Sequence, residues 1–350
     1  MCLMGFAGAC GSSSGDRLSC DDPGIGTPSA IGIDIATGKR AWSWCPGDTS
    51  TPIVMGRATG STVLWQQGTL NELVAIDDNG VELWRHPTSG TTPQAAIGDS
   101  TVAVVDNQIV ALDALTGTTR WQGDGGKLLA ARSGLLLETV GASSIRAVDL
   151  LTGAERWTQD VHVGESQYSP TVGNTILAVP YPTTNDTAIL DIATGQVLRS
   201  DHGLKWAMGD VLVTVDPGSF GVEQLSDAFT GRGLSGSVNG MPRSLPVDAE
   251  HDSRGSDLLL VTPRSDGSQA ESLQLLDATT GQTRWSVDDG VVSTVTTTQA
   301  VVSSTRTIKL LDSATGAILW RYSVRAPSHF VGSVLGTTVV VAVPTNASDD

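Results

Sequence analysis

The sequence predicts an all-β protein, an eight-bladed β-propeller built from four-stranded antiparallel blades. Two observations carry this prediction: a short phrase occurs eight times in the 350 residues, and it recurs every 35 to 50 residues. Each phrase holds an apolar run, an Asp, a Thr-Gly or related pair, and in six copies a Trp four residues after the Gly. A period of this size is typical of propellers and other repeat arrays.

The third copy shows why the phrase forms a hairpin. An apolar strand covers Ile109 to Leu112, and Asp113 ends it, since its carboxylate accepts hydrogen bonds from amides one or two residues ahead. Gly117 supplies a positive φ, and Trp121 can bury against a neighbouring unit. We expect the same structural roles at Asp34, Gly38, Trp42, Asp77, Gly80, Trp84, Asp149, Gly153, Trp157, Asp277, Gly281, Trp285, Asp312, Gly316 and Trp320.

A second pair of short strands precedes each phrase, with turns such as Gly98-Asp99 and Gly173-Asn174. Four strands per period make one propeller blade. The first phrase, residues 31–44, supplies only two outer strands, and a surplus pair remains around 330–334 and 338–343. We therefore predict that both ends of the chain complete the first blade, which removes exposed edges. A linear β-solenoid is the alternative.

Two copies, around Gly195 and Gly231, lack the Trp, and we expect these blades to pack less tightly. The repeats run nearly end to end without a linker, so one propeller domain is predicted. The expected organisation is a partial signal peptide over 1–9, a flexible tether over 10–28, the propeller over 29–343 and a tail over 344–350.

The N-terminus resembles a bacterial lipoprotein signal. Small residues lead to Cys10, the expected lipidation site, and a Gly-Ser tether follows. The segment departs from the full pattern, since it has no Lys or Arg before a short apolar run. We expect an extracytoplasmic protein anchored by lipid; secretion without lipid and a cytoplasmic location are the alternatives.

Composition bounds the partners. The formal net charge is −16, which argues against nucleic acid or an anionic membrane surface as the main partner. The alternative explanation is a solvated surface whose like charges keep the protein molecules apart from one another. Cys20 and Cys45 flank the first hairpin and can form a disulfide in an oxidising compartment; two free thiols are the alternative.

The sequence carries no recognisable catalytic, cofactor or metal site. The five histidines fall in different blades without metal-ligand spacing: His86, His162, His202, His251 and His329. The densest acidic stretch lacks the spacing of a calcium loop and is interpreted as a solvated insertion, with an adventitious calcium site as the alternative; its residues are Asp248, Glu250, Asp252 and Asp257.

The phrase Asp-x-x-Thr-Gly-x-x-x-Trp resembles the pyrroloquinoline quinone (PQQ) repeat family, with residues 110–117 and 275–281 as the closest copies. The resemblance implies a propeller and covers about residues 29–343, but the family holds both quinone-dependent dehydrogenases and non-catalytic scaffolds. Its enzymes use an adjacent cysteine pair, and none occurs here. The chain is more similar to BamB-type lipoprotein propellers, which have no cofactor, and to PQQ-repeat proteins of actinobacteria.

Loops of varied length are expected on the face opposite the Thr-Gly turns, where recognition usually resides. Exposed aromatics are favoured interface anchors, which makes Tyr181 and Phe220 the candidate partner-binding residues. We predict a monomeric, non-enzymatic cell-envelope scaffold that binds a protein or peptide partner and contacts the membrane only through its lipid. A small-ligand or carbohydrate-sensing propeller and a quinone-dependent dehydrogenase are the alternatives.

The predicted disulfide can be tested by mass spectrometry of the exported protein without reduction. We expect a peptide pair joined through Cys20 and Cys45, and full alkylation of both thiols before reduction would contradict it.

Overall fold

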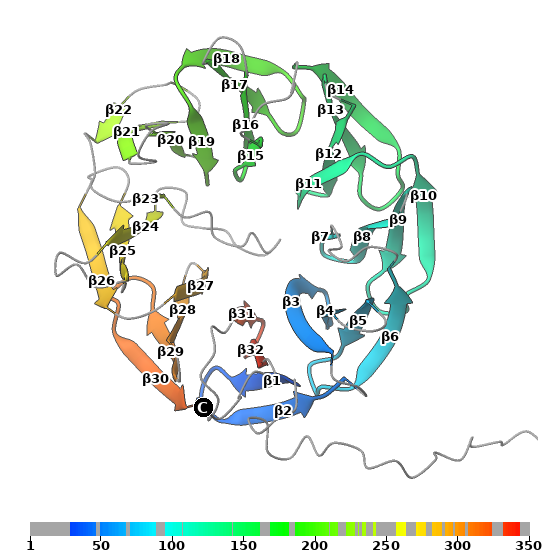
Figure 1. The fold of residues 1–350 in the computed structure, drawn as a ribbon, viewed down its shortest axis with the longest axis vertical. Coiled ribbons are helices and arrows are strands. Elements are labelled where there is room, and N and C mark those ends of the chain that lie inside the picture. The colour runs from blue at the N-terminus through cyan, green and yellow to red at the C-terminus, as the bar shows by residue number, and fades with distance from the viewer. Residues whose placement is uncertain are drawn as a thin grey trace, which may run out of the picture.

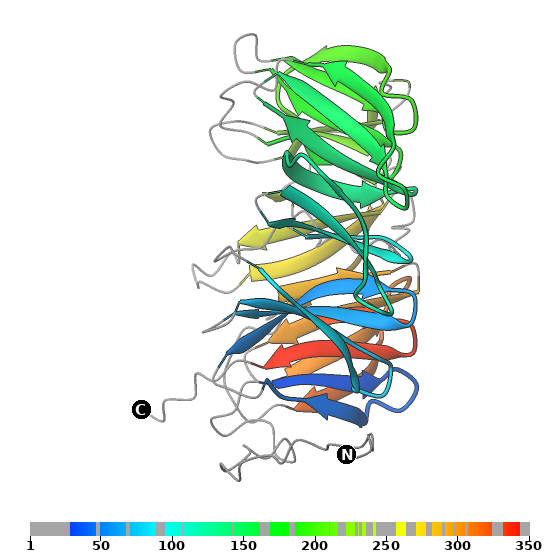
Figure 2. The ribbon, with the colours of Figure 1, turned by 90° about the vertical axis from the view of Figure 1, so that its right-hand side faces the viewer.

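The computed structural model arranges the repeats in a ring, seen face-on in Figure 1 and edge-on in Figure 2. It describes residues 29–46, 50–67, 71–88, 95–106, 108–141, 143–161, 169–181, 186–209, 211–215, 222–227, 230, 233–235, 241–242, 257–263, 271–277, 282–288, 291–296, 298–304, 307–323 and 332–343. Across these residues the chain forms strands joined by turns, with no helix. The all-β prediction is confirmed for this part of the chain.

The described strands form eight four-stranded antiparallel sheets, which we number as blades 1 to 8. The first four are blade 1 with β1 (Ser29–Asp34), β2 (Arg40–Trp44), β31 (Gly332–Leu335) and β32 (Thr338–Val343); blade 2 with β3 (Thr51–Ala58), β4 (Ser61–Gln67), β5 (Glu72–Ile76) and β6 (Glu82–Pro87); blade 3 with β7 (Ala95–Ile97), β8 (Thr101–Asp106), β9 (Gln108–Asp113) and β10 (Thr119–Gly123); and blade 4 with β11 (Lys127–Arg132), β12 (Leu135–Val140), β13 (Ser144–Asp149) and β14 (Glu155–Asp160).

The other four are blade 5 with β15 (Thr171–Val172), β16 (Ile176–Pro180), β17 (Asp186–Asp191) and β18 (Val197–His202); blade 6 with β19 (Lys205–Met208), β20 (Val211–Val215), β21 (Val222–Asp227) and β22 (Gly233–Ser235); blade 7 with β23 (Met241–Pro242), β24 (Asp257–Pro263), β25 (Glu271–Asp277) and β26 (Thr283–Asp288); and blade 8 with β27 (Val291–Val295), β28 (Gln299–Ser304), β29 (Thr307–Asp312) and β30 (Ile318–Ser323). In Figure 1 the first strand of each of blades 2 to 8 faces the centre of the ring and the last lies on the rim, while in blade 1 these places are taken by β31 and β2.

Blade 1 combines strands from the two ends of the repeat array. Its strand order is β2-β1-β32-β31, and β1 pairs with β32 from Ser29 opposite Val343 to Asp34 opposite Thr338. The described innermost strand of this blade, β31, begins at Gly332, slightly later than the sequence predicts. Segments about 300 residues apart in the chain therefore share one sheet (Figure 1).

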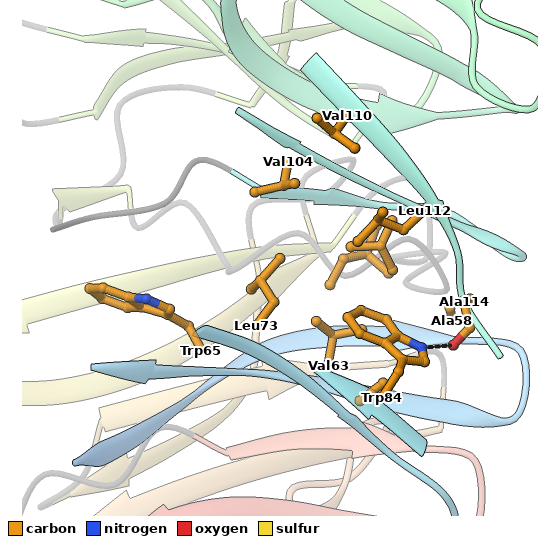
Figure 3. Close-up of a cluster of buried hydrophobic side chains, with 12 residues drawn as sticks. Ala58, Val63, Trp65, Leu73, Trp84, Val104, Val110, Leu112 and Ala114 are labelled. Atoms are coloured by element: carbon orange, nitrogen blue, oxygen red, sulfur yellow. Dashed lines mark hydrogen bonds between the residues drawn. The ribbon is translucent and has the colours of Figure 1, made fainter. Parts of the chain in front are cut away.

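The hydrophobic core lies between neighbouring sheets. Strands β4 and β32 are buried almost throughout, because apolar side chains project from both faces of each sheet and pack against the neighbouring sheets. Between blades 2 and 3, Val63 and Leu73 pack with Val104 and Leu112 beside Trp84 (Figure 3). Burying one Leu or Val side chain in such a cluster stabilises the fold by about 1.5–3 kcal/mol, so adjacent blades depend on each other for their stability.

Within a blade the two hairpin turns lie on one face. Backbone bonds connect them directly: Ala114 N donates to Ser100 O at 3.1 Å in blade 3, and Ile35 N donates to Thr337 O at 2.9 Å in blade 1. Figure 2 shows the β1–β2 and β31–β32 turns on the same side of the ring. We call this side the Asp-Thr-Gly face and the opposite side the variable face.

Each blade has a β-bulge between its two outermost strands. In blade 3, Thr119 pairs with Leu112 and Trp121 pairs with Ala111, so Arg120 between them is left over. All eight outermost strand pairs show a register shift at the matching place. A bulge re-aims the side chains that follow it, and here the Trp after the bulge turns toward the next blade.

The repeated tryptophans join neighbouring blades. Trp84 of blade 2 donates from Nε1 to Ala114 O of blade 3 at 2.8 Å (Figure 3), and its Cγ lies 2.6 Å from where a Cβ on Gly117 would be. The turn glycine therefore supplies both the positive φ of 67° and the room for the indole. We call this contact a tryptophan bridge. Four more follow the same pattern, from Trp121 to Leu150 O (2.9 Å), Trp157 to Ile192 O (2.9 Å), Trp285 to Ser313 O (2.8 Å) and Trp320 to Ile35 O (2.7 Å).

Two described boundaries differ. Blade 5 has Arg199 where six of the other blades have Trp, and Arg199 Nη2 donates to Asp227 O of blade 6 at 3.1 Å. A hydrogen bond from an arginine thus joins blades 5 and 6, at a boundary where the missing Trp predicted looser packing. Trp42 of blade 1 packs against Gly80 of blade 2, but its buried Nε1 has no acceptor.

Replacing Trp121 by Ala should destabilise the protein by about 3–5 kcal/mol, because it removes buried aromatic surface and the bridge to blade 4. The control Trp121→Phe keeps most of the packing and should lose about 1 kcal/mol, the value of one hydrogen bond. Urea unfolding measures both. Equal stability of Trp121→Ala and the parent protein would show that the bridge does not hold the blades together.

Candidate functional site

The repeated aspartates hold the turns of the Asp-Thr-Gly face. Asp113 Oδ1 accepts hydrogen bonds from Leu115 N at 3.0 Å, Thr116 N at 2.8 Å and Thr116 Oγ1 at 3.0 Å, while Gly117 N donates to Asp113 O at 2.9 Å. The amide two residues ahead of the Asp was predicted, and the structure adds the one three residues ahead because the turn closes over five residues. The same Asp-to-Thr bonds occur at Asp34, Asp149, Asp191, Asp227 and Asp312.

The bulge residue completes the turn in three blades. Arg120 pairs with Asp113 Oδ2 at 2.6 Å, and Arg156 pairs with Asp149 Oδ2 at 2.5 Å. Arg284 and Asp277 form the third pair at 2.9 Å. Each of these carboxylates therefore binds an arginine with one oxygen, and in blades 3 and 4 the other oxygen caps the turn.

Hydrogen bonding also moves the pKa values of these groups. The bond from Arg156, followed by that from Thr152, lowers the pKa of Asp149 from 3.8 to about 2. The pKa of Asp34 is lowered chiefly by the Thr37 hydroxyl. A general acid or base works best with a pKa near the operating pH, so these carboxylates are suited to holding the fold and not to moving protons at neutral pH.

Of the two candidate partner-binding residues, the structure describes Tyr181, which directly follows β16. Tyr181 is half-buried, packs against the cluster that contains Leu177 and Val179, and its backbone N donates to Asp186 O at 2.8 Å. Its ring therefore stabilises blade 5 as well as offering an edge to solvent. Phe220 lies outside the described residues, so convergence of the two aromatics remains a prediction.

The described histidines do not gather. His86 lies in blade 2, and His202 lies in blade 5 with Nδ1 2.9 Å from Asp186 Oδ1 and a largely exposed side chain. Within the described ranges, no group of three or more His, Cys, Asp or Glu side chains is placed to hold a metal ion. His162, His251, His329 and the acidic residues 248–252 lie outside those ranges, while Asp257 is the first residue of β24.

The cysteines fall mostly outside the described part of the chain. Cys45 follows β2 and is disulfide-bonded, and its partner is not among the described residues. The pairing with Cys20 and the lipidation of Cys10 both stay predictions.

Sequence reasoning missed a buried ion pair in blade 4. Glu138 on β12 is fully buried, accepts a hydrogen bond from Gly126 N at 3.0 Å and pairs with Arg146 on β13 at 2.7 Å. A lone Glu inside an apolar strand, opposite an Arg in the next strand, was the signal that could have found it. All its partners are protein groups of the same blade, so the pair is structural.

A second missed feature is a set of exposed apolar side chains. Leu115 and Leu151 occupy matching turn positions of blades 3 and 4, each 52% exposed on the Asp-Thr-Gly face. Leu83, Leu198 and Leu319 take the bulge position that holds Arg in blades 3, 4 and 7. Aligning the repeats position by position would have shown both substitutions.

The chain matches a protein-family model described as outer membrane protein assembly factor BamB over residues 29–227 and 243–349. The chain belongs to this family. The predicted resemblance to PQQ-like repeat propellers is thereby confirmed. No curated protein matches the sequence. The described residues include no helix of the length and apolar character needed to cross a bilayer.

Solved structures share the fold of this family member. The computationally designed Ika8 protein is similar at 17% identity, with 85% of this chain and 97% of that chain covered and a TM-score of 0.55. The quinohemoprotein alcohol dehydrogenase ADHIIG from Pseudomonas putida HK5 is similar at 12% identity, with 89% and 70% covered and a TM-score of 0.51. BamB from Moraxella catarrhalis is 17% identical over 93% and 97%, with a TM-score of 0.40. At these identities the two similarities with a TM-score above 0.5 concern the fold alone.

The role of Asp149 can be tested through pH. Its folded-state pKa of about 2 lies below the ordinary 3.8, so its stabilising effect is present above pH 4 and is lost as the pH falls toward 2. Because Arg156 is more than half exposed and the pair is screened, we expect Asp149→Asn to lose about 1 kcal/mol at pH 7. Chemical denaturation at pH 7, 4 and 2 should show this difference shrinking at the lowest pH.

The control Arg156→Gln removes the ion pair and leaves the Thr152 bonds, so it should lose less stability than Asp149→Asn. A difference between Asp149→Asn and the parent that stays constant down to pH 2 would contradict the assigned role.

Proposed function

We propose that this protein is a non-enzymatic scaffold of the cell envelope that works as a closed eight-bladed propeller and binds a protein or peptide partner. The observation that carries the proposal is the family match, which spans residues 29–227 and 243–349 and is described as an outer membrane protein assembly factor. The eight described sheets and the pairing of β1 with β32 support the closed ring. A ring of this kind holds loops on a rigid frame, which suits recognition.

We further propose an extracytoplasmic location with a lipid on Cys10. The tether 10–28 would then join the lipid to β1, the strand through which the chain enters blade 1. The disulfide at Cys45 supports an oxidising compartment, because disulfides are rare in the cytosol. The protein would contact the membrane through its lipid and act as a monomer.

The variable face over blades 5 to 7 is the proposed partner surface. The turns of the Asp-Thr-Gly face are uniform, and their polar groups are used within the turns, as the bonds of Asp113 and Asp149 illustrate. The segments that differ most between blades connect strands on the opposite side. Tyr181 begins one of these segments, at the end of β16.

The main competing function is quinone-dependent oxidation, since a quinohemoprotein alcohol dehydrogenase shares the fold. That similarity is 12% in sequence and concerns the fold alone. The sequence has four cysteines, at positions 2, 10, 20 and 45, and none are adjacent, whereas the quinone enzymes use an adjacent pair. We therefore place the scaffold function first.

Photo-crosslinking in intact cells tests the proposal. A benzoylphenylalanine in place of Phe220 reports on the variable face, and the same residue in place of the exposed Thr116 reports on the Asp-Thr-Gly face. We expect a reproducible adduct with an envelope assembly protein from position 220 and none from position 116, since the proposed partner surface is on the variable face.

Each other outcome contradicts part of the proposal. Adducts from position 116 alone would move the partner to the other face. No adduct with an envelope protein from either position, combined with saturable binding of the quinone to the purified protein, would favour the enzyme.

A further inference from the structure

The boundary between blades 1 and 2 differs from the other described boundaries in its tryptophan. Trp42 is buried and touches the turn glycine Gly80, as the other tryptophans do, but its Nε1 donates no hydrogen bond. At five other boundaries this nitrogen donates at 2.7–2.9 Å to the carbonyl that follows the turn Asp. A buried donor without an acceptor loses its hydration without replacement, which destabilises the contact.

Two departures from the repeat explain the difference. The turn of blade 2, Asp77 to Gly80, is one residue shorter than the Asp-x-x-Thr-Gly turns, so the acceptor carbonyl does not come to the same place. In addition, Gly32 stands two residues before the Asp of blade 1, where the corresponding residues of the other copies carry a side chain. A Cβ at Gly32 would lie 2.4 Å from Trp42 Nε1, so the nitrogen edge of the indole rests on its own blade.

A second side chain at this boundary is also incompletely bonded. Arg57 on β3 is 13% exposed, binds Asp78 Oδ2 through Nη2 at 3.2 Å and packs against Gly336 in the β31–β32 turn of blade 1. Its Nε and Nη1 are buried without an acceptor. The boundary thus holds three buried donors that are not satisfied, against one, Trp65 Nε1, in the cluster between blades 2 and 3. Its charged contact joins two parts of blade 2 and does not cross to blade 1.

Blade 1 is better attached on its other side. Trp320 of blade 8 donates to Ile35 O at 2.7 Å and packs on Gly38, with the same geometry as the other bridges. Apolar packing of Trp44, Val54 and Leu64 keeps blades 1 and 2 together in the closed ring. The two boundaries of blade 1 therefore differ in polar bonding while both are filled with apolar side chains.

We propose that the boundary between blades 1 and 2 is a built-in joint at which the ring opens, with blade 1 remaining attached to blade 8. Opening of this kind is a local event that costs less free energy than global unfolding. Because the chain enters blade 1 directly after residue 28, the joint lies beside the strand that receives the N-terminal segment. The joint is a property of the propeller itself and holds whatever partner the protein binds.

Native-state cysteine labelling of the full chain tests the joint. Val54 on β3 and Ile97 on β7 are each 8% exposed, lie on innermost strands and face the boundaries between blades 1 and 2 and between blades 2 and 3. We expect the thiol of Val54→Cys to be labelled about fivefold faster than that of Ile97→Cys, the factor that corresponds to one hydrogen bond. Peptide mass spectrometry separates these thiols from the native cysteines.

A repaired ring is the matched control. Gly32→Ala combined with insertion of a Thr before Gly80 rebuilds the regular repeat, and it should slow labelling at position 54 about fivefold while leaving position 97 unchanged. If the repaired chain does not fold, Trp84→Phe removes the bridge at the next boundary and should raise labelling at position 97 to the rate at position 54. Equal labelling of Val54→Cys and Ile97→Cys in the parent background, or no response to these variants, would overturn the proposal.

Discussion

The structure depends on the packing of an outer-strand tryptophan against the turn glycine of the next blade. A β-bulge turns the indole toward the neighbour, the glycine leaves room for it, and the carbonyl after the Asp accepts its hydrogen, as Trp84, Gly117 and Ala114 show. Each copy of the phrase thus supplies both halves of the contact. Its Trp donates to the next blade, and the carbonyl of its turn accepts from the preceding blade. Trp320 makes the same contact on Gly38, so blade 8 packs against blade 1 as the other blades pack against their neighbours.

The repeated Asp of the phrase makes up eight of the 37 acidic residues in the chain. The repeat carboxylates are acidic groups in a chain of net charge −16, but their oxygens are bonded to turn amides, threonine hydroxyls and bulge arginines. Such bonds favour the ionised form, so these carboxylates are poorly suited to transferring protons at neutral pH. Function is therefore better sought in the segments that vary between blades than in the residues that repeat.

The positions that depart from the repeat are what distinguish one blade from another. Leucines replace the bulge arginine in blades 2, 5, 6 and 8, Arg199 replaces a tryptophan, and Gly32 with a shortened turn alters the contact of Trp42. Each departure changes one boundary or one patch of surface and leaves the blade intact. A propeller tolerates this because each blade has its own strand pairing and shares only its faces with two neighbours. A propeller can therefore vary at single boundaries and surface positions without losing its blades.

The sequence by itself determined the all-β class, the four-stranded unit, the turn chemistry and the family, since period, Asp-Thr-Gly spacing and Trp position are local patterns. Only the tertiary structure decided which carbonyl each indole bonds, that Arg199 bridges blades 5 and 6, that Tyr181 is half-buried, and that Glu138 is paired inside blade 4. The reason is physical: these contacts join residues about 30 or more positions apart or in adjacent strands, and their geometry follows from how two sheets meet. The candidate surface was therefore the least predictable part, because its residues lie in segments that follow no repeat.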